Sequence, residues 1–261
     1  MNFKNFLQSK PTADRCHLLD CLRGLTVLNM TAFHAIWDLV YIFGINWTWY
    51  HGQGAYIWQQ GICWSFILLS GFCSGMSRHL LRRGLTVFGL GAGITLFTAL
   101  FMPEDLIIFG VLTLIGSCML IMALCRKLLQ KIPSVIGILI SFFLFAFTKH
   151  INSGFLGFFR KEFFHLPEIL YQNYFTAYFG FPQIGFYSTD YFSLLPWLFL
   201  FLTGFFIYQQ FGEKILNSKW QGIGILNLIG RHALEIYVLH QPVIYGILWL
   251  CFRSSHQFRF L

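Results

Sequence analysis

Charged residues are scarce in this 261-residue chain, where Asp, Glu, Lys and Arg together make up only 11%. A soluble globular domain carries about 25%. Hydrophobic residues account for 56% of the chain, and its mean hydropathy is +0.62. The apolar runs are longer than the segments of about 10 residues that build a membrane β-barrel. We therefore expect an all-α fold, a polytopic bundle of transmembrane helices.

Motifs for metals, nucleotides and disulfides are missing. None of the 7 cysteines forms a CxxC pair, and most lie within or at the end of apolar runs, so we expect buried thiols. The sequence has no HExxH, Walker loop or dinucleotide fingerprint, and we predict no metal and no redox cofactor. The first 19 residues lack an apolar core followed by a cleavage site, so the first span is expected to act as an uncleaved insertion signal.

Seven apolar stretches approach the roughly 20 residues needed to cross the hydrocarbon layer. They are 19–43, 55–76, 84–101, 105–125, 132–148, 191–211 and 232–252. The long segment 149–190 mixes aromatic and polar residues, and its pieces 158–164 and 168–181 indicate interfacial or re-entrant elements. We interpret residues 1–261 as one transmembrane domain with an N-terminal tail over 1–18.

The net charge of +8 comes from short clusters of Lys and Arg between the apolar runs. Such clusters indicate topological anchors rather than nucleic-acid binding. Clusters precede the first span and follow the second, fourth and sixth, whereas 44–54 and 102–104 hold no Lys or Arg. The positive-inside rule then predicts a cytoplasmic N-terminus and an external 149–190 segment in a cell (inner or plasma) membrane. Seven spans would place Arg253 and Arg259 outside, against the rule.

A polar stripe runs along the first span, because Asp20, Arg23, His34 and Asp38 share one helical face. A charge at the centre of a spanning helix costs about 2.5–3.5 kcal/mol on insertion scales, so it normally has a partner or a function. His34 follows Arg23 by eleven residues, about 16 Å along the axis. Asp38, one turn further, could hydrogen-bond the imidazole as in general base catalysis. The alternatives are ordinary helix-end charges for Asp20 and Arg23, and a polar cluster that joins helices.

Three polar residues elsewhere are candidate substrate contacts. Asp190 precedes the sixth span, where it either caps that helix or holds an acceptor outside the membrane. Arg231 has the spacing to pair with Glu235 on one helix. His240 is expected near mid-membrane and could supply a second polar group at the site of the first span.

The spacing of Arg23 and His34, R-(ten residues)-H, resembles the signature of transmembrane acyltransferases of the acyltransferase-3 type. The wider sequence is closer to bacterial relatives of heparan-α-glucosaminide N-acetyltransferase. The blocks that carry this resemblance are LLDCLRGLTVLNMTAFHAIWDLVYIFGI, WSFILLSGFCSGMSR, FGVLTLIG, DYFSLLPWLFLFLTGFFI and IGRHALEIYVLHQPVIYGIL. Each block is weakly specific, but they follow one another in the family's order over nearly the whole chain.

The resemblance implies a membrane-embedded enzyme that moves an acyl group, usually acetyl, from cytosolic acyl-CoA to a sugar or amino-sugar acceptor. It implies that Arg23, with Asp20 beside it, binds the donor, and that His34 is the catalytic histidine, oriented by Asp38. The chain departs from the family pattern at two places. Thr113 stands where the family often has His or Gln. The lysosomal enzymes carry Asn near the place of His34 and their catalytic histidine around the 44–51 loop, which makes His51 a rival.

Two other function classes are compatible with the sequence. A transporter or flippase could use His34 and Asp38 to relay protons or bind substrate, although it would not need an arginine at the mouth of the same stripe. An inactive accessory membrane protein would tolerate loss of His34. Within the enzyme hypothesis, the residues do not choose between direct transfer and a covalent acyl-histidine. The expected partners are the lipid bilayer, acyl-CoA and a glycan acceptor, without nucleic acid, and a homo-oligomer is compatible.

Overall fold

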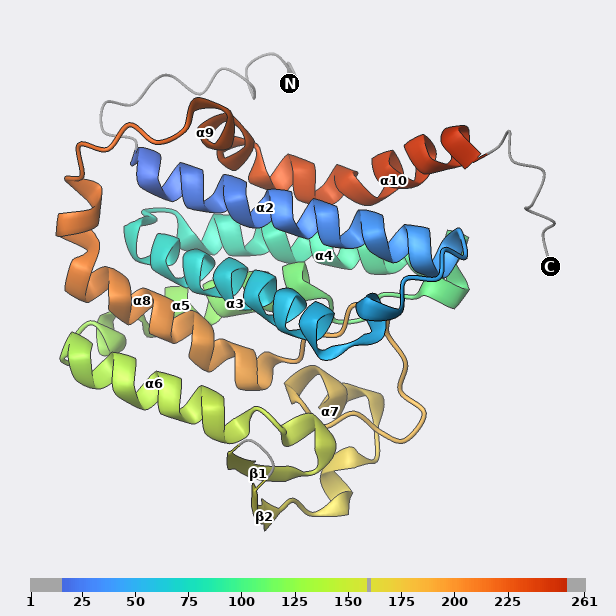
Figure 1. The fold of residues 1–261 in the computed structure, drawn as a ribbon. Coiled ribbons are helices and arrows are strands. Elements are labelled where there is room, and N and C mark those ends of the chain that lie inside the picture. The colour runs from blue at the N-terminus through green and yellow to red at the C-terminus, as the bar shows by residue number, and fades with distance from the viewer. Residues whose placement is uncertain (1–15, 159–160, 253–261) are drawn as a thin grey trace. The chain divides into compact units, whose positions relative to one another are not determined.

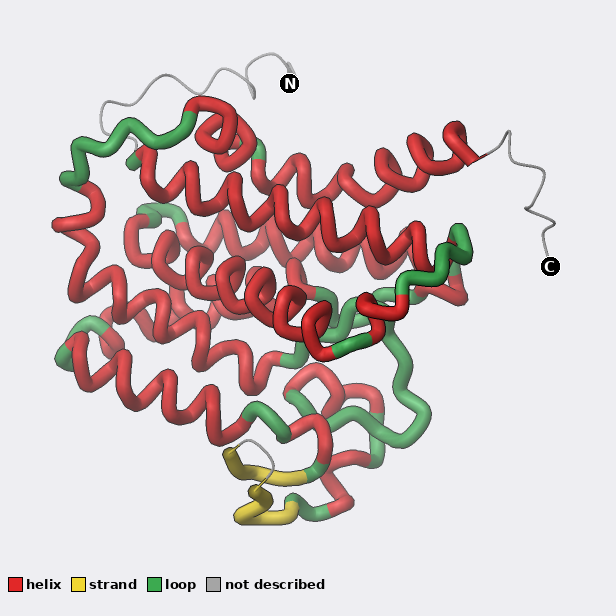
Figure 2. The backbone as a smooth tube through the Cα atoms, in the orientation of Figure 1, coloured by secondary structure: helices red, strands yellow, loops and turns green. Residues whose placement is uncertain are grey.

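The structure, a computed structural model, describes residues 16–158 and 161–252. Figures 1 and 2 show that nearly all of its regular structure is helical, with one two-stranded sheet. Six helices of the described chain are long and apolar enough to cross a membrane. These six are His17–Ile42, which comprises α2 (His17–Trp37) and a π-helical turn (Asp38–Ile42), then α4 (Leu80–Phe101), α5 (Val111–Leu129), α6 (Ser134–Thr148, continued to Ser153), α8 (Leu194–Leu216) and α10 (Ala233–Phe252). The prediction of a polytopic helical membrane protein is confirmed.

The second predicted span, 55–76, forms helix α3 (Gln53–Met76), whose 24 residues reach about 36 Å. That length is enough to cross a bilayer, but α3 is not one of the six because its first half carries Gln53, Gln59 and Gln60. The last predicted span, 232–252, begins one residue later than predicted because His232 separates α10 from a short helix, α9 (Gly224–Arg231). The charges at Arg253 and Arg259 lie outside the described residues.

The first of two compact units contains the described residues up to Phe66 and from Glu213 onward. In this unit α2 packs against both α9 and α10. Helices α2 and α9 approach so closely that a Cβ atom on Gly24 would lie 2.0 Å from the Leu226 carbonyl oxygen. A Cβ atom on Gly230 would lie 1.8 Å from the Asp20 carbonyl oxygen. Glycine at both positions therefore brings the two backbones into contact, as small residues do between membrane helices.

The second unit, Ile67–Gly212, contains the paired helices α4 and α5, together with α6 and most of α8. Small residues again determine the packing. A Cβ atom on Gly71 of α3 would lie 2.0 Å from the Phe201 carbonyl oxygen of α8. Helices α6 and α8 are joined by a buried hydrogen bond between the hydroxyls of Ser141 and Thr203 at 2.9 Å. The interior between these helices is mainly aromatic and aliphatic, with Phe145 and Phe201 fully buried.

The predicted segment 149–190 overlaps the candidate span Ser134–Ser153 at its first five residues, and its described remainder holds only short elements. Its interfacial or re-entrant placement stays a prediction. Strands β1 (Phe155–Phe158) and β2 (Lys161–His165) form an antiparallel hairpin with a bulge between Leu156 and Gly157. A 3-10 turn (Glu168–Tyr171) and the short helix α7 (Tyr174–Phe179) follow. The N-terminus of α7 is capped by Asn173, whose side-chain oxygen accepts a hydrogen bond from the Thr176 N–H at 3.0 Å.

Candidate functional site

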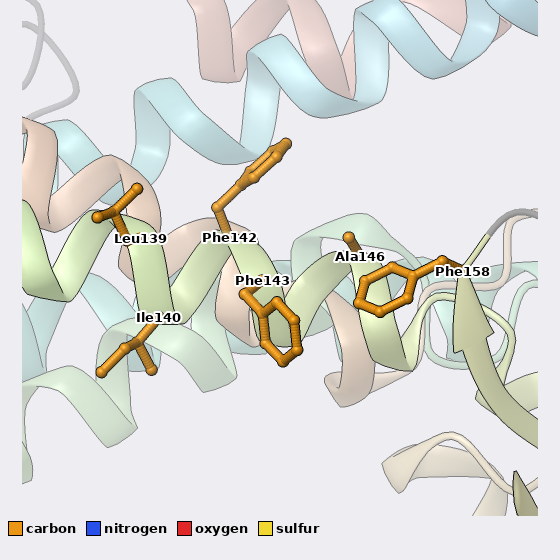
Figure 3. A pocket seen from close by; sticks show the side chains of 6 residues that line it. All are labelled: Leu139, Ile140, Phe142, Phe143, Ala146 and Phe158. Carbon is orange, nitrogen blue, oxygen red and sulfur yellow. The ribbon is translucent and has the colours of Figure 1, made fainter. Parts of the chain in front are cut away.

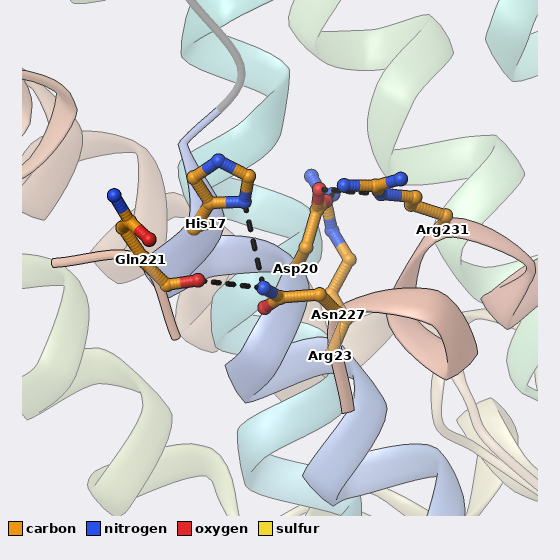
Figure 4. A network of polar contacts seen from close by, with 6 residues as sticks. All are labelled: His17, Asp20, Arg23, Gln221, Asn227 and Arg231. Atoms are coloured by element: carbon orange, nitrogen blue, oxygen red, sulfur yellow. Dashed lines mark hydrogen bonds and ion pairs between the residues drawn. The ribbon is translucent and has the colours of Figure 1, made fainter. Parts of the chain in front are cut away.

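The first turn of α2 and the end of α9 form a charged cluster, shown in Figure 4. The Asp20 carboxylate has Arg23 Nη1 at 3.0 Å from one oxygen and Arg231 Nε at 3.8 Å from the other. Its side chain is 10% exposed, whereas those of Arg23 and Arg231 are 33% and 37% exposed. Two guanidinium groups thus share one carboxylate, which leaves a net positive charge at a partly open surface.

Arg231 pairs with Asp20 and not with Glu235, the partner that its spacing in the sequence predicted. A hydrogen bond or ion pair to Glu235 would need an unbroken helix from 231 to 235, but α9 ends at Arg231 and α10 begins at Ala233. The break turns Arg231 toward α2, while the carboxylate of Glu235 lies 4.0 Å from Nδ1 of His232. Arg231 therefore belongs to the same cluster as Arg23.

Polar contacts hold α9 in this position (Figure 4). The Asn227 side chain donates to the Gln221 carbonyl at 2.8 Å, and its nitrogen lies 3.4 Å from Nδ1 of His17. The close backbone contact at Gly230 adjoins Arg231 in sequence. The position of the second arginine is therefore fixed by helix packing and by side-chain contacts.

A second polar cluster lies further along α2, where α10 packs against it. The rings of His34 and His240 are adjacent, with centroids 4.9 Å apart and planes at 61°. The Gln241 side-chain nitrogen donates to Oδ1 of Asp38 at 2.6 Å. Two consecutive residues of α10 thus face two residues of α2 that are one turn apart.

Asp38 is fully buried and begins the π-helical turn that ends α2. A π-turn inserts an extra residue into the helix and is found frequently at functional sites. The hydrogen bond from Gln241 accounts for one carboxylate oxygen. The role of Asp38 in orienting His34 stays a prediction. Sequence reasoning missed Gln241, although its place directly after His240 was a usable signal.

His51 lies in the 3-10 turn Thr48–His51, next to the π-turn of α2. Its Nδ1 is 3.1 Å from the hydroxyl of Tyr41, and both side chains are exposed. The preceding residue, Tyr50, is buried, and its hydroxyl donates to the Phe33 carbonyl oxygen at 3.1 Å. Burial, with smaller effects of Tyr41 and Asp38, raises the pKa of Tyr50. His51 thus lies near the C-terminal end of α2, and its side chain is more exposed to solvent than that of His34.

Asp190 belongs to the second unit. Its Oδ2 accepts a hydrogen bond from the backbone N–H of Val111, the first residue of α5, at 3.4 Å. Sequence reasoning offered Asp190 as a cap for the sixth predicted span, but the structure shows that the carboxylate contacts a different helix start. Burial raises the pKa of Asp190 to about 6, against a smaller lowering by the Val111 hydrogen bond.

A groove beside α6 offers no catalytic groups. It is lined only by apolar side chains, shown in Figure 3: Leu139, Ile140, Phe142, Phe143, Ala146 and Phe158. Within residues 16–158 and 161–252, no three His, Cys, Asp or Glu side chains come together as metal ligands.

Comparison with known proteins gives one result. The model of the family described as "Heparan-alpha-glucosaminide N-acetyltransferase, catalytic" matches residues 15–242. The match contains both clusters on α2 and the three residues of α9 and α10 that complete them, Arg231, His240 and Gln241. No curated protein and no solved structure matches the chain.

Proposed function

Because this chain belongs to the family of the heparan-alpha-glucosaminide N-acetyltransferase catalytic domain, we propose that it transfers an acetyl group from acetyl-CoA to a sugar or amino-sugar acceptor. Its family and its membrane-length helices make it a membrane acetyltransferase. The donor, the acceptor and the residue roles below are part of the proposal.

The observation that carries the proposal is the pair of arginines around Asp20. Coenzyme A has a phosphate-rich head, and the planar guanidinium group binds phosphate oxygens through two parallel hydrogen bonds. The side chains of both arginines are about one-third exposed, so both can be reached from solvent. Asp20 holds the two cations together and offsets half of their charge. We assign Arg23 and Arg231 to the donor head, on the cytoplasmic side of the membrane.

His34 is the proposed catalytic histidine. The eleven residues from Arg23 to His34 correspond to about 16 Å along α2, a distance that the pantetheine arm of the donor can cover. At His34 the imidazole takes a proton from the acceptor amine or hydroxyl while that group attacks the thioester carbonyl carbon. General base help of this kind is typically worth about 10²–10⁴-fold.

A transporter or flippase is the second candidate. Buried Asp38 and the adjacent imidazoles of His34 and His240 form the kind of polar cluster that proton-coupled transporters place within the membrane. Such a protein has no use for two arginines gathered at one end of the same helix. Donor binding therefore separates the two candidates.

The test uses purified full-length protein and acetyl-CoA with a panel of amino sugars. We expect release of CoA and acetylation of at least one sugar, and loss of both in His34→Ala. Acetyl-CoA should also raise the melting temperature, and the rise should shrink in Arg23→Ala and in Arg231→Ala. Lys161→Ala is the matched control, because it removes an exposed cation of β2 in the other unit. Folded protein whose melting temperature does not respond to acetyl-CoA would contradict the proposal.

A further inference from the structure

His240 is held in one tautomer by its own helix. Its Nδ1 lies 2.6 Å from the backbone carbonyl oxygen of Tyr237. A carbonyl oxygen only accepts hydrogen bonds, so Nδ1 must carry the proton. In the neutral ring Nε2 then carries a lone pair and no hydrogen. The backbone contact of Nδ1 therefore determines which nitrogen of the His240 ring carries the proton.

The Nε2 atom of His240 is buried and has no hydrogen-bond partner in the described structure. A buried acceptor without a donor costs free energy, because it has lost its hydrogen bonds to water without replacing them. Such an atom calls for an explanation, and active sites are one place where it occurs. The neighbouring ring is that of His34, at 4.9 Å between centroids.

The contact between His240 and His34 is held by the next residue of α10. The Gln241 side chain donates to the buried Asp38 carboxylate at 2.6 Å, and Asp38 follows His34 by one turn of α2. Because 240 and 241 are consecutive, this hydrogen bond fixes which residue of α10 lies beside His34. The ring of Tyr237 also lies near His240, at 5.6 Å between centroids.

We propose that His240 is the proton-accepting partner of His34. This inference rests on the proposed acetyl transfer. As the acceptor nitrogen or oxygen forms its bond to the thioester carbonyl carbon, its proton passes to one ring nitrogen of His34. The proton on the opposite ring nitrogen of His34 passes to Nε2 of His240 through a hydrogen bond that these adjacent rings, 4.9 Å apart between centroids, form in the reacting state. His240 then becomes an imidazolium held by Tyr237. The C–S bond then breaks, and the CoA thiolate recovers a proton as the relay runs back, so that both histidines end neutral.

The physical advantage of this arrangement is that the positive charge formed during the reaction can move away from His34. Two adjacent buried imidazoles are unfavourable when both are protonated, because like charges repel strongly at low dielectric. The pair therefore holds a single positive charge, and the relay moves that charge from His34, beside the reacting atoms, to His240. His240 acts through His34 and is in this sense a positioning residue that also stores a proton.

The decisive variant is His240→Asn. An asparagine side-chain N–H can replace the Nδ1 donor toward the Tyr237 carbonyl, but no basic atom replaces Nε2. We expect kcat for acetyl transfer to fall by about 100-fold, with an unchanged KM for acetyl-CoA and an unchanged rise of the melting temperature with acetyl-CoA. Added imidazole should restore part of the rate in His240→Ala. His165→Asn, at an exposed site on β2, is the matched control and should leave kcat unchanged.

A merely structural histidine would give a different result. His240→Asn would then keep kcat, and imidazole would not rescue His240→Ala; either outcome overturns the relay while acetyl transfer by the wild type upholds the enzyme. A wild-type protein without transfer activity would overturn both. Independently of activity, the ¹⁵N spectrum of histidine-labelled protein, minus that of His240→Asn, should show His240 with a protonated Nδ1 and a bare Nε2. A protonated Nε2 with a bare Nδ1 would also overturn the proposal.

Discussion

The carboxylate of Asp190 has an environment that few surface acids share. It faces the start of α5, where the Val111 N–H donates to it, and a Cβ atom on Gly110 would lie 3.1 Å from it. Burial raises its pKa from 3.8 to about 6, so the folded protein keeps this proton over a range in which the unfolded chain has lost it. The folded state then binds more protons than the unfolded state, and the free energy of unfolding falls as the pH rises from about 4 to 6.

Asp190→Asn should remove this dependence, because the amide does not titrate and its oxygen can still accept from Val111. We expect the variant to match the wild type near pH 4 and to have a higher melting temperature above pH 6. Thermal unfolding of both proteins at a series of pH values in detergent measures the difference. Parallel curves over the whole range would show that Asp190 does not titrate in this way.

Asp20 illustrates what a single carboxylate can organise. Its two oxygens approach one arginine from its own helix and one from a segment more than two hundred residues later. The i, i+3 pair with Arg23 follows from helical periodicity alone. The contact with Arg231 does not, because it depends on the helix break at His232 and on the crossing of α2 and α9.

At the scale of elements, the crossing of α2 and α9 depends on two glycines. In the observed packing, Cβ atoms on Gly24 and Gly230 would lie 2.0 Å and 1.8 Å from carbonyl oxygens of the facing backbone. Backbone cannot yield as a flexible side chain can, so a methyl group at either place must push the helices apart. Overpacking of this kind typically costs about 1–3 kcal/mol.

Gly230→Ala should therefore lower the melting temperature and also weaken the response to acetyl-CoA, since Arg231 is the next residue. The matched control is Gly89→Ala on α4, where a Cβ atom would meet no other atom within 4 Å. Alanine is the better helix former by about 1 kcal/mol, so the control should be neutral or slightly stabilising. Equal effects of the two substitutions would exclude close packing as the cause.

For the whole molecule, the question is how many times the chain crosses the membrane. Six helices are apolar enough to cross, and α3 is not one of them. Whether α3 also crosses therefore decides on which side of the membrane each later loop lies. If α3 crosses, and the N-terminus is cytoplasmic, the cluster Arg78, Arg82 and Arg83 lies in the cytoplasm as the positive-inside rule favours. The same orientation places the start of α2 and the start of α10 on one side, in keeping with the contact of Asp20 and Arg231.

Truncated fusions test this topology directly. A green fluorescent protein fused after Arg78 should fluoresce, and alkaline phosphatase fused after Glu104 should be active, because only the second position is external. Exchange of the two reporters should abolish both signals. An active phosphatase after Arg78 would mean that α3 does not cross and would reverse the assignment of the later loops.

The membrane class, the main helices and the polar stripe of α2 could all be predicted without the structure. These are properties of composition and of local periodicity, which act within one helix and need no knowledge of the partner. The ordered blocks also indicated the family. Helix α5 begins at Val111, six residues after the predicted start at 105, because the 3-10 turn at Pro103 and the loop to Gly110 are apolar enough to extend the hydropathy signal.

The contacts between polar groups of different helices could not be predicted in this way. Helical spacing suggested Glu235 for Arg231 and the sixth span for Asp190, whereas packing brings Arg231 to Asp20 and Asp190 to the start of α5. The same packing pairs Gln241 with Asp38 and His240 with His34. The physical reason is that contacts between helices depend on crossing points, helix breaks and the small residues that permit close approach, and none of these is contained in the period of one helix.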